Sequence, residues 1–213
     1  MKITKFVHSC LLVEMPGPVN RTALFDPGVF SEEALDIGRL VFLDDIIITH
    51  IHPDHFSLGL VKRLVAKFPK VRITATPEVV SRLQAEGIAA SSRESEGIVF
   101  FEAPHEKIMS SQPQNIGVHY LDLLTNPGDS HSFTETKPVL ALPVTAPWGS
   151  NVAAMELALK LKPKYIIPVH DCHWSKAGRE WSYAMMQQAF GPARIDFIQP
   201  QTGESFVLDI QEY

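Results

Sequence analysis

The chain contains the stretch Asp45-Ile-Ile-Ile-Thr49-His50-Ile51-His52-Pro53-Asp54-His55, in which a run of β-branched residues leads directly into three histidines and an aspartate. The run up to Thr49 is typical of a buried strand. Alternate residues of an extended chain point to the same side, so His50 and His52 can bind one metal ion together. Beyond Pro53, Asp54 and His55 can turn toward a second ion. Because imidazole and carboxylate groups are ligands of zinc and other first-row metals, the stretch predicts a metal site where a core strand ends. A surface loop that is merely rich in histidine is the alternative.

Later strand patterns end in a similar way. Gly97–Ala103 leads to Pro104-His105, and Tyr165–Val169 leads to His170. Asp129 lies in a polar loop after a strand expected over 116–124, and Gly128 lets that loop turn tightly. Sites in open α/β sheets gather at the carboxyl ends of strands, so we expect these loops to meet at one edge.

These residues provide enough ligands for two metal ions that share a carboxylate and a water. In the expected arrangement, one ion takes His50, His52 and His105, the other takes Asp54, His55 and His170, and Asp129 bridges them. Asp54 and Asp129 are also the candidate catalytic residues, since either can orient a water and accept its proton. His119 is the main alternative to His105, although its place inside a strand pattern also fits an ordinary strand histidine.

Other residues near the expected ligands are candidates for supporting roles. The candidate substrate-binding residues, which lie close to ligand positions in the chain, are His131, Trp148 and His173. Asp26 and His8 are candidates for orienting ligands from behind, with a turn-forming aspartate and a core histidine as the alternatives. Cys172 stands between two histidines, but the ligand set is complete without it, so we expect a free thiol.

The pattern of elements predicts a single domain over residues 1–213 with two related halves, about 1–114 and 115–213. Each half opens with paired strands that end in an acid, Asp26 or Asp129, and each has an apolar strand that ends in histidine. Helices are expected over 58–68, which Ser57 can cap, after Thr76-Pro77, over 151–161 and over 176–190. Single strands are expected over 2–15 and 116–124, and a closing hairpin from 194–199 and 205–210.

The composition is that of a globular protein, with 45% hydrophobic and 20% charged residues. The formal net charge of -5 and the lack of a Lys/Arg run argue against nucleic acid as a partner. Two cysteines are too few for a disulfide framework and favour the cytoplasm. The first residues lack a signal-peptide pattern, and no run approaches the ~20 apolar residues of a membrane span. We therefore expect a cytoplasmic protein that acts on a small molecule; the pattern predicts no oligomeric state.

The order of the motifs resembles the metallo-β-lactamase superfamily. The His-x-His-x-Asp-His motif stands at 50–55, a later histidine follows a strand at Pro104-His105, an aspartate lies in Gly128-Asp129-Ser130, and a last histidine ends the strand 166–170. The opening stretch 6–14 and Phe25-Asp26-Pro27 are similar to the branch that includes ascorbate-6-phosphate lactonase. One departure is Pro104-His105-Glu106, where many members have Gly-His-Thr/Ser.

The resemblance implies an α/β fold, a four-layer αββα sandwich of two mixed β-sheets flanked by helices. It implies a metal-dependent hydrolase in which a metal-activated water or hydroxide attacks an ester, lactone or phosphodiester-type substrate. The implied cofactor is a pair of divalent metal ions, zinc in the first place, with manganese or iron as alternatives. Two other functions stay open: an iron-dependent redox enzyme of the same fold, and a non-catalytic metal-binding protein.

Overall fold

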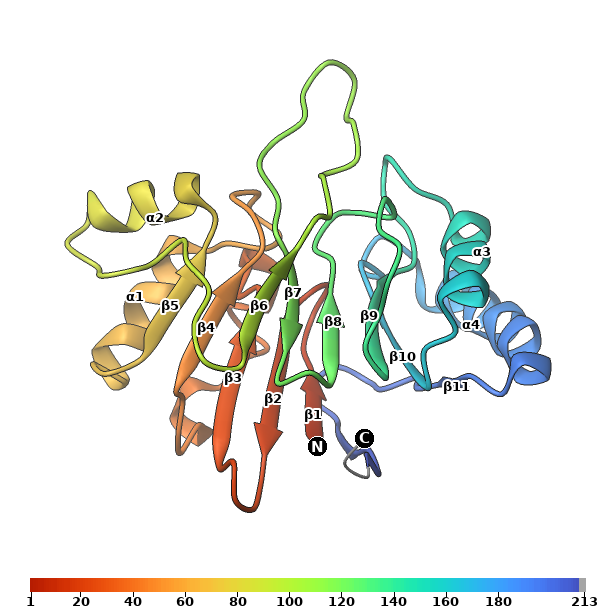
Figure 1. The fold of residues 1–213 in the computed structure, drawn as a ribbon, viewed down its shortest axis with the longest axis horizontal. Coiled ribbons are helices and arrows are strands. Elements are labelled where there is room, and N and C mark those ends of the chain that lie inside the picture. Colours follow the sequence, from red (N-terminus) through yellow and green to blue (C-terminus); the bar gives the residue numbers. More distant parts are fainter. Residues whose placement is uncertain (211–213) are drawn as a thin grey trace. The chain divides into compact units, whose positions relative to one another are not determined.

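A computed structural model describes residues 1–210 of the chain (Figure 1). These residues fall into two compact units. Unit 1 comprises Met1–Glu94 with the described part of Pro200–Tyr213, and unit 2 comprises Ser95–Gln199. These boundaries differ from the expected halves at 1–114 and 115–213, because the end of the chain returns to the first strand. The expectation that residues 1–213 form one domain stays a prediction.

Unit 1 contains a mixed six-stranded sheet in the order β12-β1-β2-β3-β4-β5. The strands are β1 (Lys2–Lys5), β2 (Leu11–Met15), β3 (Arg21–Phe25), β4 (Asp45–Ile48), β5 (Arg72–Ala75) and β12 (Ser205–Val207). Neighbours from β12 to β3 pair antiparallel, whereas β3, β4 and β5 run parallel. Every residue of β4 is buried, as expected for an apolar run inside a parallel sheet.

Two helices pack their apolar sides against the sheet of unit 1. Helix α1 (Leu58–Lys67) buries Leu60, Val61 and Leu64, and α2 (Pro77–Gln84) buries Val79, Val80 and Leu83. These side chains form one core cluster with Ile46 and Ile48 of β4. Ser57 begins α1 as predicted, because its Oγ accepts the backbone N–H of Leu60 at 3.1 Å. Short 3-10 helices, η1 (Val29–Ser31) and η2 (Ile37–Arg39), occupy the connection from β3 to β4.

Two ion pairs to the buried carboxylate of Asp45 hold the start of β4. Arg21 Nε of β3 lies 2.7 Å from Asp45 Oδ2, and Arg72 Nη2 of β5 lies 2.9 Å from Asp45 Oδ1. Burial raises the pKa of the Asp45 carboxyl, and the hydrogen bond and charge of Arg21 oppose that rise. The carboxylate thus joins three parallel strands at the end opposite to the histidines.

Unit 2 contains the second mixed sheet, in the order β11-β10-β9-β8-β7-β6. The strands are β6 (Ile98–Phe101), β7 (Gly117–Tyr120), β8 (Leu124–Asn126), β9 (Val139–Pro143), β10 (Tyr165–Val169) and β11 (Asp196–Phe197). Strands β6, β7 and β8 pair antiparallel, and β8 to β11 run parallel. Leaving β12 aside, each unit has two antiparallel pairings followed by parallel ones, and the expected relation between the two halves stays a prediction.

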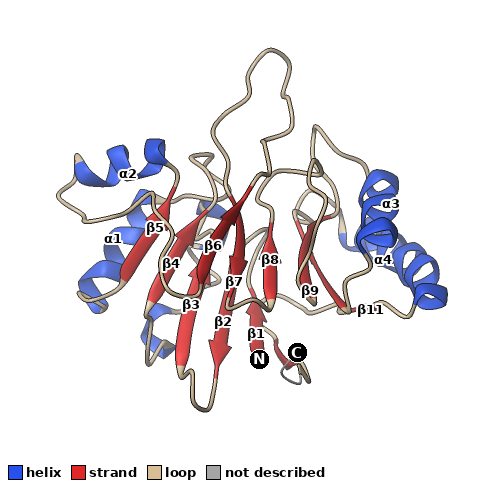
Figure 2. Cartoon of the chain, viewed as in Figure 1, coloured by secondary structure: helices blue, strands red, loops and turns tan. Residues whose placement is uncertain are grey.

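The helices of unit 2, drawn in blue in Figure 2, are α3 (Asn151–Leu161) and α4 (Lys176–Phe190), followed by the 3-10 helix η3 (Gly191–Ala193). Their bounds confirm the prediction. Ala154, Ala158, Met186 and Phe190 from the helices pack with Leu140 and other strand residues in one core cluster. Each unit therefore supplies a mixed sheet and two helices, which confirms the predicted class of two mixed sheets flanked by helices.

Two expected strands were wrong in detail. The stretch 2–15 turns back at 6–10, where the Phe6 N–H donates to Cys10 O at 2.9 Å and His8 has a φ of 64°. The stretch 116–124 likewise folds into the β7–β8 pair, with Leu121 and Asp122 at positive φ. Because neither turn contains glycine or proline, the sequence pattern did not reveal them.

The predicted closing hairpin is also wrong. Strand β11 pairs parallel with β10, whereas β12 pairs antiparallel with β1 at the other end of the chain. Short polar strands of this kind take their partners from long-range packing, which local periodicity does not record.

Neither cysteine forms a disulfide bond. Burial raises the pKa of the Cys10 thiol to about 12, so it behaves as a core residue. Among residues 1–210, the helices all lack the length and apolar character that crossing a bilayer requires.

We predict that Leu64→Ala lowers the free energy of unfolding by about 2–5 kcal/mol, because Leu64 is fully buried where α1 packs on β4. Urea unfolding measures the difference. Val41→Ala is the matched control, since Val41 is 75% exposed and should change stability by less than about 0.5 kcal/mol. Equal effects of the two substitutions would contradict this packing.

Candidate metal centre

The end of β3 holds the histidine loop of unit 1 through Asp26. This side chain is fully buried, and its Oδ1 accepts the backbone N–H of Thr49 at 2.8 Å. The Thr49 hydroxyl lies 3.0 Å from Asp26 Oδ2, and His55 Nδ1 lies 3.0 Å from the same oxygen. With Nδ1 donating to a carboxylate, His55 presents Nε2 on the other side of its ring. The expected orienting contact of Asp26 is confirmed.

The turn after Asp26 requires glycine because two backbone segments meet there. A Cβ on Gly28 would lie 2.0 Å from the carbonyl oxygen of Asp54. Around this contact, the Val29 N–H donates to Pro53 O at 2.8 Å, and the Ser57 N–H donates to Pro27 O at 2.9 Å. The β3 turn therefore determines the path of the histidine loop.

His50 and His52 lie together, as their i, i+2 spacing predicted. His50 Nε2 is 3.2 Å from His52 Nδ1, and the rings meet edge to face at 4.8 Å between centroids. His50 Nδ1 lies 3.1 Å from the Thr49 hydroxyl, on the opposite side of the ring. Two nitrogens bound to one zinc at about 2.0–2.1 Å in tetrahedral geometry are separated by roughly 3.3 Å, so this spacing fits ligands of one ion.

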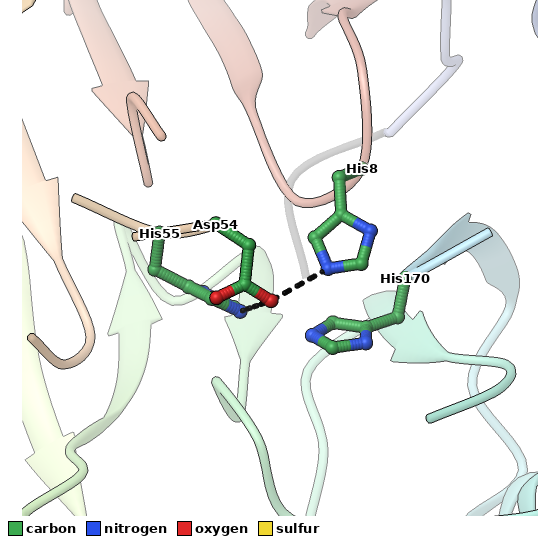
Figure 3. A group of neighbouring side chains, drawn as sticks. All are labelled: His8, Asp54, His55 and His170. Carbon is green, nitrogen blue, oxygen red and sulfur yellow. Dashed lines mark hydrogen bonds and ion pairs between the residues drawn. The ribbon is translucent and has the colours of Figure 1, made fainter. Parts of the chain in front are cut away.

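Asp54 lies between two imidazoles of unit 1. His8 Nε2 is 3.0 Å from Asp54 Oδ2, a contact drawn as a dashed line in Figure 3, and His55 Nε2 is 3.8 Å from the same oxygen. His8 is fully buried and has a positive φ, which is an uncommon backbone state for a residue other than glycine. Ligand atoms of His8, Asp54 and His55 all lie within 4.8 Å of one another.

Unit 2 has its own group around the buried carboxylate of Asp129. Asp129 Oδ1 lies 2.7 Å from His170 Nε2, and Oδ2 lies 3.5 Å from His105 Nε2. The indole Nε1 of Trp148 donates to Oδ2 at 3.1 Å. Each carboxylate oxygen thus faces a different imidazole, which is the arrangement that a carboxylate shared between two ions needs.

Backbone carbonyls orient both imidazoles of unit 2. His105 Nδ1 donates to Glu106 O at 2.6 Å, and His170 Nδ1 donates to Thr145 O at 3.1 Å. In both rings this leaves Nε2 directed at Asp129, because the two nitrogens lie on opposite sides. His170 also adopts a φ of 65° directly after β10.

Asn115 fixes the loop that carries Asp129. Its amide nitrogen donates to Ala103 O at 2.6 Å and to Pro127 O at 2.8 Å, and its Oδ1 accepts the Asp129 N–H at 3.2 Å. Gly128 has a φ of 58°, so the tight turn expected at this glycine is confirmed. Asn115 thereby connects the segment before His105 with the Asp129 loop.

His119, the alternative to His105, lies elsewhere in unit 2. It is a strand residue of β7, where its Nδ1 is 3.0 Å from the Thr125 hydroxyl and its ring stacks on Phe101 at 4.3 Å. Burial lowers the pKa of the His119 imidazole, and Glu135 opposes the shift. These contacts are those of a histidine packed within a strand.

The three candidate substrate-binding residues have different environments. Trp148 and His131 meet edge to face at 5.1 Å and line an open hollow of about 530 Å³. His131 Nε2 donates to Pro143 O at 2.8 Å, and burial lowers the pKa of this imidazole. His173 is exposed, with its ring 6.0 Å from that of His170.

Sequence reasoning missed two of the contacts that hold the carboxylates. One is the indole hydrogen bond from Trp148 to Asp129, and the other is the three-way anchoring by Asn115. The chain offers no local motif for either, since the partners lie 19 and 14 residues apart. In the sequence, Gly28 could have indicated that the β3 turn closely approaches the histidine loop.

The donor chemistry of both groups fits divalent metal ions. Imidazole nitrogens and carboxylate oxygens gather, and His50, His55, His105 and His170 each hold a polar partner on the far side of the ring. Such partners are characteristic of metal-binding histidines, because they fix the tautomer and the ring orientation. The described residues therefore include groups that can hold metal.

Known proteins are similar to this chain. Residues 2–170 match the family model described as a beta-lactamase superfamily domain. Protein Rv0786c of Mycobacterium tuberculosis is 28% identical over 184 residues, which cover 80% of this chain and 84% of that protein. A metal-dependent hydrolase of Azorhizobium caulinodans is 32% identical over 97 residues, 42% of this chain and 39% of that protein.

A solved structure, that of the metallo hydrolase Igni18 from the archaeon Ignicoccus hospitalis, matches with a TM-score of 0.71. The two are 16% identical, and the match covers 99% of each chain, so this likeness concerns the fold. The narrower resemblance to the ascorbate-6-phosphate lactonase branch stays a prediction. Because the family model spans well over half of its residues, the chain belongs to the metallo-β-lactamase superfamily of metal-dependent hydrolases.

Proposed function

We propose that this protein is a two-metal hydrolase that acts on an ester, lactone or phosphodiester-type small molecule. The proposed ligands are the residues of the sequence motifs: His50, His52, Asp54, His55, His105, Asp129 and His170. The observation that carries the proposal is Asp129, whose two oxygens lie 2.7 and 3.5 Å from the Nε2 atoms of two different histidines.

Zinc is the proposed metal, because tetrahedral sites of nitrogen and oxygen ligands suit it, with manganese or iron as alternatives. When bound, such ions lower the pKa of a coordinated water to about 7 and polarise a carbonyl or phosphoryl oxygen. Two side chains of the protein, those of Asp54 and Asp129, are proposed to orient the attacking water and to accept its proton.

The surrounding contacts support a rigid site. Asp26 and Thr49 hold His55 and His50 from behind, and the carbonyls of Glu106 and Thr145 hold His105 and His170. An enzyme loses activity when its catalytic groups are misplaced by about 1 Å. The hydrogen bonds that hold these four histidines in place would therefore favour catalysis. A non-catalytic metal-binding protein would not need a carboxylate directed at two sites.

We predict that His105→Gln removes bound metal, whereas His119→Gln does not. Both histidines are buried in unit 2, but His105 faces Asp129 and His119 faces Thr125. Elemental analysis after purification without added metal gives the number and identity of ions per chain. Loss of metal in the His119 variant alone would overturn the assignment of the third histidine, and iron as the sole metal would favour the redox alternative.

We predict that Asp129→Asn lowers turnover of an ester or phosphodiester by about 10²-fold or more at saturating metal, a usual scale for the loss of one well-placed catalytic group. The substitution keeps the size of the side chain but removes its charge, so the fold should persist. Asp122→Asn is the control, because the Asp122 side chain is 83% exposed and lies on the β7–β8 turn. Equal rates for the two variants would contradict the role of Asp129, and unfolding of the Asp129 variant would favour a structural site.

A further inference from the structure

The hollow of unit 2 beside Trp148 is a candidate binding site that the proposed ligands do not use. Its lining comes from Glu106, His131, Pro147, Trp148, Ser150 and Ala153, and its volume is about 530 Å³. Gly149 keeps it open, because a Cβ at that position would lie 3.3 Å from the His131 ring. The volume lies within the range of small-molecule sites, roughly 300–1,000 Å³.

The residues that line the hollow disfavour the binding of anions. Lysine and arginine are absent from the lining residues, and the one carboxyl group is that of Glu106. Its Oε1 accepts the His131 backbone N–H at 2.9 Å and the Ser132 hydroxyl at 2.7 Å, so it is fixed in place. A phosphate group would meet a like charge there, whereas an uncharged ring or alkyl chain would meet Trp148, Pro147 and Ala153.

Trp148 connects this hollow with the proposed metal ligands. Its Nε1 donates to Asp129 Oδ2 at 3.1 Å, and its ring lies 5.9 Å from that of His170 and 6.4 Å from that of His105. The indole therefore contacts the carboxylate with one edge and lines the hollow at the same time. A group bound in the hollow would lie one side chain away from Asp129.

We infer that the hollow binds the uncharged aryl or alkyl group of a carboxylic ester or lactone, and that Trp148 is both the specificity-determining residue and a positioning residue for Asp129. The inference rests on the proposed function and narrows it, since it favours carboxylic esters over phosphodiesters. Outer hydrogen bonds to metal ligands are worth about 10- to 100-fold in metal affinity, so the indole N–H has a measurable role apart from the hollow.

The binding test uses Trp148 as its own reporter. The chain has three tryptophans, so the metal-loaded variant Trp174→Phe/Trp181→Phe retains only Trp148. Its fluorescence is titrated with acetanilide, a neutral aryl amide, and with benzenesulfonate, an anionic arene whose sulfonate is a weak metal ligand. We expect a saturable change with acetanilide and at least about tenfold weaker binding of benzenesulfonate. Equal or tighter binding of benzenesulfonate would overturn the inference.

Two substitutions separate the roles of Trp148. Trp148→Phe keeps a ring but removes the N–H, so metal affinity, measured by competition with a chelator, should fall about tenfold while the preference for phenyl acetate over methyl acetate persists. Trp148→Ala should lower metal affinity as well and reduce that preference about tenfold. Trp181→Phe is the control, because Trp181 is 68% exposed on α4.

The inference fails if Trp148→Ala, which is checked for folding by circular dichroism, retains the wild-type preference for phenyl acetate. If that variant does not fold, Trp148→Phe with unchanged metal affinity would still refute the positioning role. Failure of the proposed function looks different: the wild-type protein would bind no metal or would hydrolyse neither ester, whatever the acetanilide titration shows.

Discussion

The histidine loop of unit 1 depends on one buried carboxylate, that of Asp26 at the end of β3. A buried carboxylate is costly unless several donors satisfy it, and here the donors are the Thr49 backbone, the Thr49 hydroxyl and His55 Nδ1. Satisfying Asp26 therefore fixes the first residue after β4 and the last histidine of the motif. The orientation of His55 follows from a requirement of folding, before any metal is considered.

In unit 2, uncharged groups fix the orientation of the histidines. Asn115 joins three backbone segments, and the carbonyls of Glu106 and Thr145 accept the Nδ1 protons of His105 and His170. Parallel strands β9 and β10 deliver their carboxyl ends beside this network, as α/β sheets do at their binding sites. The two units thus use a hairpin, an acid and parallel strands in the same order, with different polar groups behind the histidines.

The sequence predicted the parts of the fold that local pattern determines. The apolar run before His50, the Ser57 cap and the helices at 151–161 and 176–190 were recognisable because periodicity and capping act over a few residues. The turn at His8 and the β7–β8 turn were missed, since residues other than glycine adopt positive φ there. The pairing of β12 with β1 was missed because it joins residues about 200 positions apart.

For the candidate centre, the histidine motif and Asp129 could be found because strand ends and spacing suffice to suggest ligands. The hydrogen bonds behind them could not, because Trp148 and Asn115 reach Asp129 only through the folded loops. His8 and Asp26 were expected to orient ligands, but their partners Asp54 and His55 could not be assigned, because these lie 46 and 29 positions away in the chain. The sequence therefore indicates which residues can bind metal, whereas the hydrogen bonds that orient those residues arise only in the tertiary structure.

The proposed hydrolytic mechanism depends on Asp129 bridging two metal ions. A crystal structure of the metal-loaded protein, with anomalous diffraction collected at the zinc absorption edge, tests this bridge directly. We expect two anomalous peaks about 3.5–4 Å apart, each within about 2.0–2.2 Å of a different oxygen of Asp129. A single peak that Asp129 does not touch, or ions bound away from His105 and His170, would contradict it.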